Sequence, residues 1–253
     1  DNSPLVEFLE EVLDCEKIQD SIDAGLVHAL SVTASGYGSG QSVTFYQGAK
    51  EIVPWRRARR IGIPTQIGIA HLLASSALPF IFPASRINRE YFGDGSMRQI
   101  APISSALHLG ATRILVIGAT TISNGQAKRA EMKDYPTLAQ IAGHALNSLF
   151  LDNMEVDLER VQHLNKLAAL LPEAARAQAD IRHIDVLVVS PSRPIEKIAE
   201  RYATELPWTI RLLLRLTGAV HQSGATLVSY LLSEGKFCRA LIDLGYQDAL
   251  QQR

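Results

Sequence analysis

The spacing of apolar and polar residues predicts that helices and strands follow one another in the first part of the chain. Ser3 and Pro4 form a helix-start signal, and the apolar residues after them recur at helical spacing. The segments 26–34 and 42–48 are typical of strands, and the glycine-rich loop between them favours a β-hairpin. Small and apolar residues over 64–79 predict a second helix, which ends at a proline.

Two later segments are nearly continuous runs of apolar residues. The segment 112–120 (TRILVIGAT) follows a short helix predicted over 101–111, and the segment 184–192 (IDVLVVSPS) repeats its pattern. A strand that is apolar on both faces belongs in the middle of a covered sheet, which is usually parallel. A helical region predicted from about 136 to 179 lies between the two strands, and this order favours an α/β architecture.

The predicted fold class is therefore α/β, with a partly parallel central sheet covered by helices. Residues 80–95 are expected to form short extended pieces and turns, and the residues after Pro194 to form a helical C-terminal tail. No internal repeat or low-complexity linker interrupts the sequence. We expect one domain, with the sheet over about 1–192 and the tail over about 193–253.

Composition excludes some classes of function. Lys and Arg number 25 against 26 Asp and Glu, so the net charge gives no general reason to expect nucleic acid as a partner. Cys15 and Cys238 match no metal-ligand spacing and predict reduced thiols in a cytoplasmic protein. No apolar run approaches the roughly 18 residues that span a bilayer, and the first residues have neither the basic nor the apolar region of a signal peptide.

Two segments suit contact with a membrane surface. WRRARR, residues 55–60, is either a solvated turn before a helix or a contact for anionic lipid or phosphate. The segment 206–220 is strongly apolar, with Trp208 near its start and Arg211 and Arg215 on one helical face. Such a helix more often packs on a core, so a peripheral membrane contact stays one of two interpretations.

The sequence predicts neither a metal nor a cofactor. Its seven histidines form no metal-binding motif, and it contains no phosphate-binding loop or dinucleotide fingerprint. His108, His144 and His221 could each act as a general base, but none lies in an identifiable motif.

The segment YFGDGSMRQIAP, residues 91–102, places Asp94 between Gly93 and Gly95. Taken alone, an Asp–Gly pair is most often an acid that stabilises its own turn. Glycines on both sides also allow another group to approach closely, which suits a reactive carboxylate held in a turn. The local sequence leaves both interpretations open.

The longer stretch HLLASSALPFIFPASRINREYFGDGSMRQIAP resembles a motif block of patatin-like phospholipases. The shared features are a helix ending in A-S-x-A-x-P, an F-x-P step, a short hairpin with an aromatic residue, and a D-G pair followed soon by a proline. Ser96 stands where that family usually has Gly or Ala. The next residues, ALHLGATRILVIG, are similar to a helix and core strand of bacterial members, so the resemblance implies a patatin-like α/β domain.

The resemblance also implies an activity. Patatin-like enzymes hydrolyse acyl esters with a Ser–Asp dyad that needs no histidine and no cofactor, in lipid degradation. Asp94 matches the dyad acid, which would accept the proton of the serine hydroxyl and orient that hydroxyl. Gly93 and Gly95 would leave room for the serine loop, and the implied substrate is a lipid or another acyl ester.

The serine half of that active site is absent from the sequence. There is no G-x-S-x-G motif and no glycine-rich oxyanion loop, and in the family both precede the region represented here. Because the chain also starts without Met, we expect it to be the C-terminal portion of a patatin-like domain, inactive by itself. An exposed sheet edge would then favour self-association, or association with the missing N-terminal part.

Two other functions are alternatives. The same fold without the serine could be a non-catalytic lipid-binding or protein-interaction module. A nucleotide-binding α/β protein is disfavoured because the phosphate loop is missing. A G-x-S-x-G motif encoded upstream of Asp1 would favour the enzyme over the binding module.

Overall fold

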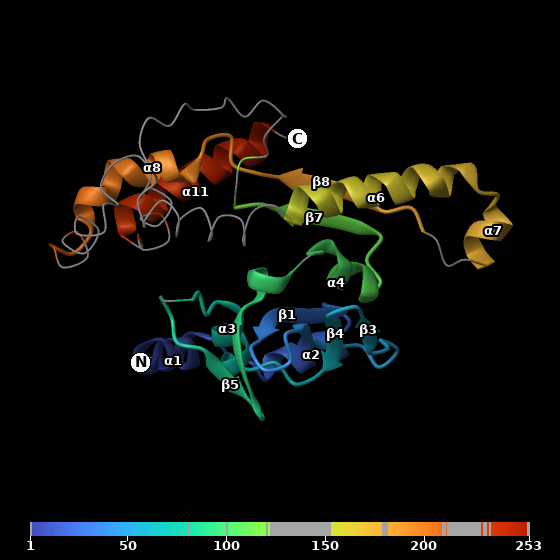
Figure 1. Cartoon of the computed structure of the whole chain (residues 1–253), viewed down its shortest axis with the longest axis horizontal. Coiled ribbons are helices and arrows are strands. Elements are labelled where there is room, and N and C mark those ends of the chain that lie inside the picture. Colours follow the sequence, from blue (N-terminus) through green and yellow to red (C-terminus); the bar gives the residue numbers. More distant parts are fainter. Residues whose placement is uncertain are drawn as a thin grey trace. The chain divides into compact units, whose positions relative to one another are not determined.

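The computed structural model describes residues 2–79, 81–99, 101–119, 121, 153–178, 182–208, 211, 229, 232 and 234–251. The chain forms two compact units, and Figure 1 labels their helices and strands. Unit 1 comprises Asp1–Thr112 and Val156–His183, and unit 2 comprises Arg113–Glu155 and Ile184–Arg253. The division does not coincide with the predicted border near residue 192, and the single-domain organisation stays a prediction.

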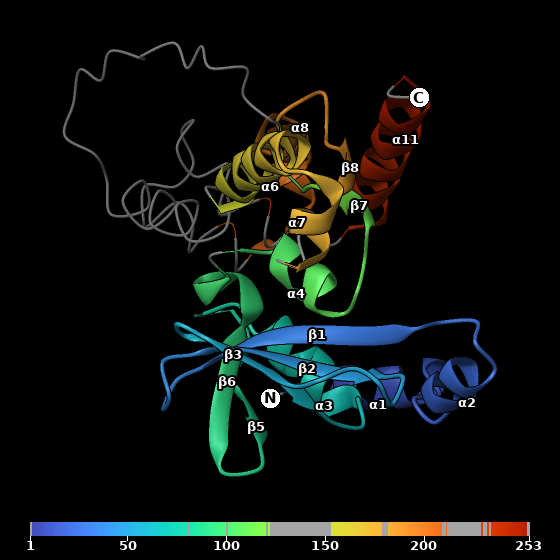
Figure 2. The ribbon, with the colours of Figure 1, turned by 90° about the vertical axis from the view of Figure 1, so that its right-hand side faces the viewer.

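Unit 1 is built around a six-stranded mixed sheet with the strand order β3-β4-β2-β1-β6-β5. Its strands are β1 (Ala29–Gly36), β2 (Ser42–Gly48), β3 (Trp55–Arg57), β4 (Arg60–Pro64), β5 (Ser85–Ile87) and β6 (Glu90–Asp94). β2 and β4 pair in parallel, whereas the other neighbours pair antiparallel. Figure 2 shows the long strands β1 and β2 side by side. The predicted hairpin and the α/β class with a partly parallel sheet are confirmed.

The helices of unit 1 follow much of the predicted order. They are α1 (Ser3–Val12), α2 (Lys17–Asp23), α3 (Ile69–Ser75), the 3-10 helix η1 (Gly95–Arg98), α4 (Ile103–His108), α6 (Asn153–Leu170), which starts in unit 2, and α7 (Glu173–Gln178). α1 has Pro4 in its first turn, and Gly110 follows α4 with φ of 96°, as expected for a helix stop. The helix predicted to start at Ser3 and Pro4 and the helix predicted over 101–111 are confirmed by α1 and α4. Residues 136–152 of the helical region predicted over about 136–179 lie outside the described residues.

The helix predicted over 64–79 is wrong at both ends. Pro64 is the last residue of β4, where it pairs with Tyr46 of β2, and α3 covers only Ile69–Ser75. Pairing with a distant strand overrides the local pattern, because sheet formation depends on the neighbouring strand more than on intrinsic preference. The α3 helix therefore begins only after the chain has left the sheet.

Two tight hairpins form the edges of the sheet. β3 and β4 are joined by Ala58 and Arg59, and β5 and β6 by Asn88 and Arg89. Arg59 and Asn88 adopt left-handed φ angles of 59° and 55°, which a two-residue turn between twisted strands favours. The segment 55–60 is therefore a hairpin and not the predicted turn before a helix. The extended pieces and turns expected over 80–95 are confirmed by β5 and β6.

The core of unit 1 joins the sheet to α3. Phe45 of β2 contacts Phe92 of β6 edge to face, with ring centroids 5.3 Å apart, and it meets His71 of α3 at 4.8 Å. Ala34 and Ala74 are completely buried beside them. This packing fixes β6, the strand that ends in Asp94, against the centre of the sheet.

Unit 2 contains a separate two-stranded sheet. β7 (Arg113–Ile117) pairs in parallel with β8 (Asp185–Val189). The helices that follow are α8 (Ile195–Tyr202), the 3-10 helix η2 (Ala203–Glu205) and α11 (Gly235–Gln251). Leu206 and Phe237 belong to the buried cluster that joins α8 to α11. The buried carboxylate of Asp248 accepts a hydrogen bond of 2.8 Å from the Ser192 backbone, which ties α11 to the residues after β8.

Both apolar strands are confirmed, and they pair in parallel, but in the described part of the chain they form a two-stranded sheet and not the predicted middle of a covered one. Leu115 is 58% exposed and Leu187 is 54% exposed, whereas Ile114 and Val116 are half-buried. A continuous apolar sequence therefore does not show whether a strand is covered on both faces or on one. Which elements cover a strand depends on tertiary contacts.

In the described part of the chain, no helix has both the length and the apolar character needed to cross a bilayer. The apolar segment 206–220 lies largely outside the described residues. Trp208, which is described, is 69% exposed.

Candidate active site

Asp94 is the last residue of β6, at the point where the strand turns into η1. It pairs with Ala34 of β1, and its backbone N–H donates to the Ala77 carbonyl at 3.0 Å. Its side-chain Oδ1 accepts a 2.9 Å hydrogen bond from the Ser96 backbone N–H and a second one from the Ser96 hydroxyl. Asp94 is therefore the N-cap of η1, a position that favours Asp because its side chain satisfies an otherwise free N–H.

The two flanking glycines are explained by close packing within the chain. A Cβ at Gly95 would lie 2.2 Å from the Thr33 carbonyl oxygen of β1, and a Cβ at Gly93 would lie 2.7 Å from the Tyr37 hydroxyl. The patatin-like resemblance implies another purpose for these glycines, namely room for a serine loop. In the structure, β1 and Tyr37 fill the spaces directly beside them.

Asp94 lines a cavity of about 590 Å³ in unit 1. Hydroxyl groups are frequent in its wall: Thr33 of β1, Ser75 and Ser76 at the end of α3, Ser96 of η1 and Ser105 of α4. The Thr44 hydroxyl, buried below, lies 3.1 Å from the Thr33 hydroxyl and 3.1 Å from the Ser105 hydroxyl. The sequence interpretation missed this hydroxyl chain, because its members come from β1, β2 and α4 and share no motif.

The second carboxylate oxygen of Asp94 is available for chemistry. Among the described residues, hydrogen bonds to this carboxylate reach only Oδ1. The part of the cavity wall that the structure describes contains Asp94 as its one ionisable side chain, and no histidine. A carboxylate anchored through one oxygen can accept a proton from a hydroxyl placed in the cavity. The arrangement suits a base that works without histidine.

His108, one of the three histidines considered as general bases, does not line this cavity. His108 lies on α4, where its ring meets the Trp55 ring at 4.8 Å, and its Nε2 atom is buried without a hydrogen-bond partner among the described residues. His144 and His221 lie outside the described residues. In the regions that the structure covers, no group of three or more His, Cys, Asp or Glu side chains could hold a metal ion.

The environment of His108 predicts a loss of stability in mild acid. Burial first, and the positive charges of Arg57 and Arg60 second, lower the pKa of His108 below its ordinary value of 6.5. As the pH falls through the ordinary value, the unfolded chain binds a proton there before the native chain does, so folding loses free energy. Urea unfolding at about pH 7.5 and about pH 5.5 should show a larger loss for the wild type than for His108→Gln. An NMR titration that places the pKa of His108 above 6.5 would contradict this.

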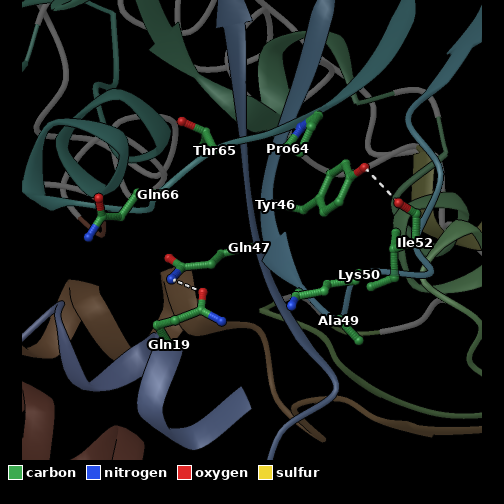
Figure 3. A pocket seen from close by; sticks show the side chains of 10 residues that line it. Gln19, Tyr46, Gln47, Ala49, Lys50, Ile52, Pro64, Thr65 and Gln66 are labelled. Atoms are coloured by element: carbon green, nitrogen blue, oxygen red, sulfur yellow. Dashed lines mark hydrogen bonds between the residues drawn. The ribbon is translucent and has the colours of Figure 1, made fainter. Parts of the chain in front are cut away.

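A second cavity of unit 1, of about 560 Å³, has a mixed wall that includes three glutamines, Gln19, Gln47 and Gln66, as well as Lys50 and apolar side chains (Figure 3). Gln47, which is 7% exposed, donates to Gln19 of α2 at 2.9 Å and accepts a 2.9 Å bond from the Ile67 backbone. Tyr46 lines the same cavity, and burial raises the pKa of the Tyr46 phenol. Because Gln47 bonds to α2 and to the chain before α3, it has a structural role between these elements.

Comparison of the chain with protein-family models, with curated proteins and with solved structures finds no match in any of the three. The patatin-like resemblance therefore rests on the residues of the chain itself.

Proposed function

We propose that this chain carries the acid of a patatin-like Ser–Asp acyl hydrolase, which cleaves lipid or other acyl esters. The observation that supports this most is the position of Asp94, which faces the 590 Å³ cavity with Oδ1 bonded to Ser96 and no hydrogen bond to Oδ2 from a described residue. The D-G pair and the preceding helix, F-x-P step and hairpin agree with the same assignment. Clefts of a few hundred Å³ are typical of sites for small ligands.

In this proposal the serine comes from a segment outside these 253 residues, because the sequence contains no G-x-S-x-G motif. Its hydroxyl would lie within hydrogen-bonding distance of Oδ2. Asp94 would take the hydroxyl proton as the oxygen attacks the ester carbonyl, and would return that proton to the leaving alcohol. Backbone N–H groups of the outside segment would stabilise the oxyanion, and no cofactor is needed.

Ester hydrolysis tests this proposal. The 253-residue chain and the product of its complete coding gene are incubated with a short-chain nitrophenyl ester and with a fluorophosphonate, which labels activated serines. We expect hydrolysis and labelling by the complete product, and neither by the chain alone. Lipid binding without hydrolysis by the complete product would instead support the non-catalytic module, and turnover by the chain alone would exclude an outside serine.

A further inference from the structure

The hairpin of β3 and β4 concentrates positive charge at one edge of the sheet of unit 1. It carries Arg56, Arg57, Arg59 and Arg60 within five residues, and the first three are exposed while Arg60 is half-buried. No ion pair reaches any of the four within the described part of the chain, and the one hydrogen bond from their side chains is from Arg57 to the Arg56 carbonyl at 3.1 Å. The charge of the three exposed arginines is therefore available to a partner.

The fold does not require this charge. Arg57 and Arg60 lie directly opposite each other across the strand pair, where like charges are destabilising. Arg59 occupies a left-handed turn position with φ of 59°, which glycine or asparagine would fill at lower cost. Arg60 interacts electrostatically with the buried carboxylate of Asp157, but that carboxylate accepts its hydrogen bond from the Ile103 backbone at 2.9 Å and forms no ion pair with Arg60 in the described part of the chain. Unbalanced charge at a conformational cost points to a role in binding.

Two exposed apolar side chains lie close to the arginines along the chain, and strand alternation places one of them, Ile63, on the same face as Arg56. Val53, just before β3, is 75% exposed, and Ile63 of β4 is 39% exposed. The Trp55 ring at the base of the hairpin stacks on the Tyr46 ring, with centroids 5.2 Å apart. Exposed arginines beside exposed apolar side chains are typical of surfaces that lie at the headgroup boundary of a membrane.

The hairpin of β5 and β6 provides an internal comparison. It has the same two-residue connection and two exposed arginines, Arg86 and Arg89. Glu90 follows directly, and Arg86 lies over the Tyr91 ring with its guanidinium 5.9 Å from the centroid. This hairpin thus has lower net charge and a partner for one arginine, which makes it a matched control.

We propose that the β3–β4 hairpin docks the protein on membranes that contain anionic phospholipids, with its arginines on lipid phosphates and Val53 and Ile63 against the acyl boundary. The charge of the hairpin complements the negative surface of such a membrane, and each arginine near that surface adds a similar increment of binding. The inference goes beyond the proposed function, because docking needs neither Asp94 nor the serine.

The test measures binding of the complete 253-residue chain to phosphatidylcholine vesicles with and without phosphatidylserine. We expect binding only to the anionic vesicles, and weaker binding at higher salt. The double variant Arg57→Gln/Arg59→Gln should bind about 30-fold more weakly, at about 1 kcal/mol for each arginine removed. The double variant Arg86→Gln/Arg89→Gln should change the affinity by less than about twofold.

Several results would overturn the proposal. These are equal binding to neutral vesicles, equal losses for the two double variants, or binding to an oligonucleotide or a phosphopeptide in place of vesicles. Thermal unfolding checks that Arg57→Gln/Arg59→Gln folds, and the single variant Arg56→Gln, at an exposed strand position, repeats the measurement independently. Asp94→Asn should bind vesicles as the wild type does, so failure of the docking proposal and failure of the hydrolase proposal are distinguishable.

Discussion

Replacing Asp94 by asparagine is expected to lower kcat/KM for ester hydrolysis about 100- to 10,000-fold in the complete product of the coding gene. Asparagine keeps the size of the side chain, and its amide oxygen can still accept the Ser96 N–H at the start of η1. It cannot accept a proton from the attacking hydroxyl. The loss should therefore fall on turnover, while thermal stability stays close to that of the wild type.

Two variants make this result specific. Asp20→Asn, at an exposed position of α2, makes the same chemical change away from the cavity and should leave the rate unchanged. Ser96→Ala removes the hydroxyl donor to Oδ1 but keeps the backbone donor, and should cost less than Asp94→Asn. Wild-type turnover by Asp94→Asn would exclude Asp94 as the base.

Replacing Gly95 by alanine is expected to destabilise unit 1 by about 3 kcal/mol, at the upper end of the usual cost of overpacking. The new Cβ would lie 2.2 Å from the Thr33 carbonyl oxygen and 2.8 Å from its carbonyl carbon. Both atoms belong to the backbone of β1, which pairs with β2 on one side and with β6 on the other, so they cannot rotate away. Urea unfolding should show a lower midpoint with an unchanged slope.

Two other glycines supply graded controls for this measurement. The Cβ that Gly93→Ala adds would contact the Tyr37 side chain, which is 52% exposed and can move. This variant should therefore lower the free energy of unfolding by less than Gly95→Ala does. The Cβ that Gly68→Ala adds would have no atom within 4 Å. Since Gly68 is the N-cap of α3, this variant should lower the free energy of unfolding by no more than about 1 kcal/mol. Equal stability of Gly95→Ala and the wild type would show that β1 and β6 are not held as closely as described.

Local sequence signals predicted those elements that depend on neighbouring residues. The first helix follows from Pro4 and the apolar spacing after it, and the helix over 103–108 ends before Gly110 as expected. The β1–β2 hairpin follows from two strand-like segments around a glycine-rich loop. In each case the hydrogen bonds lie within a few residues or across one turn, so short-range preferences are sufficient.

The candidate site could be predicted only in part. Asp94 is singled out by the glycines beside it and by the stretch before it, and the turn role expected of an Asp–Gly pair is present as the cap on η1. The hydroxyls of Thr33, Thr44 and Ser105 could not be connected from sequence. They come from separate elements, and only the folded sheet brings them within hydrogen-bonding distance.

By itself, the sequence determined the α/β class, the two apolar strands that form β7 and β8, and Asp94 as the candidate residue of the site. The tertiary structure decided that Pro64 belongs to β4 and not to a helix, and that β7 and β8 form their own sheet. It also decided why Gly95 is glycine, since the Thr33 carbonyl occupies the place of a side chain. Strand partners and close backbone contacts join residues far apart in the chain, and local preferences do not encode them.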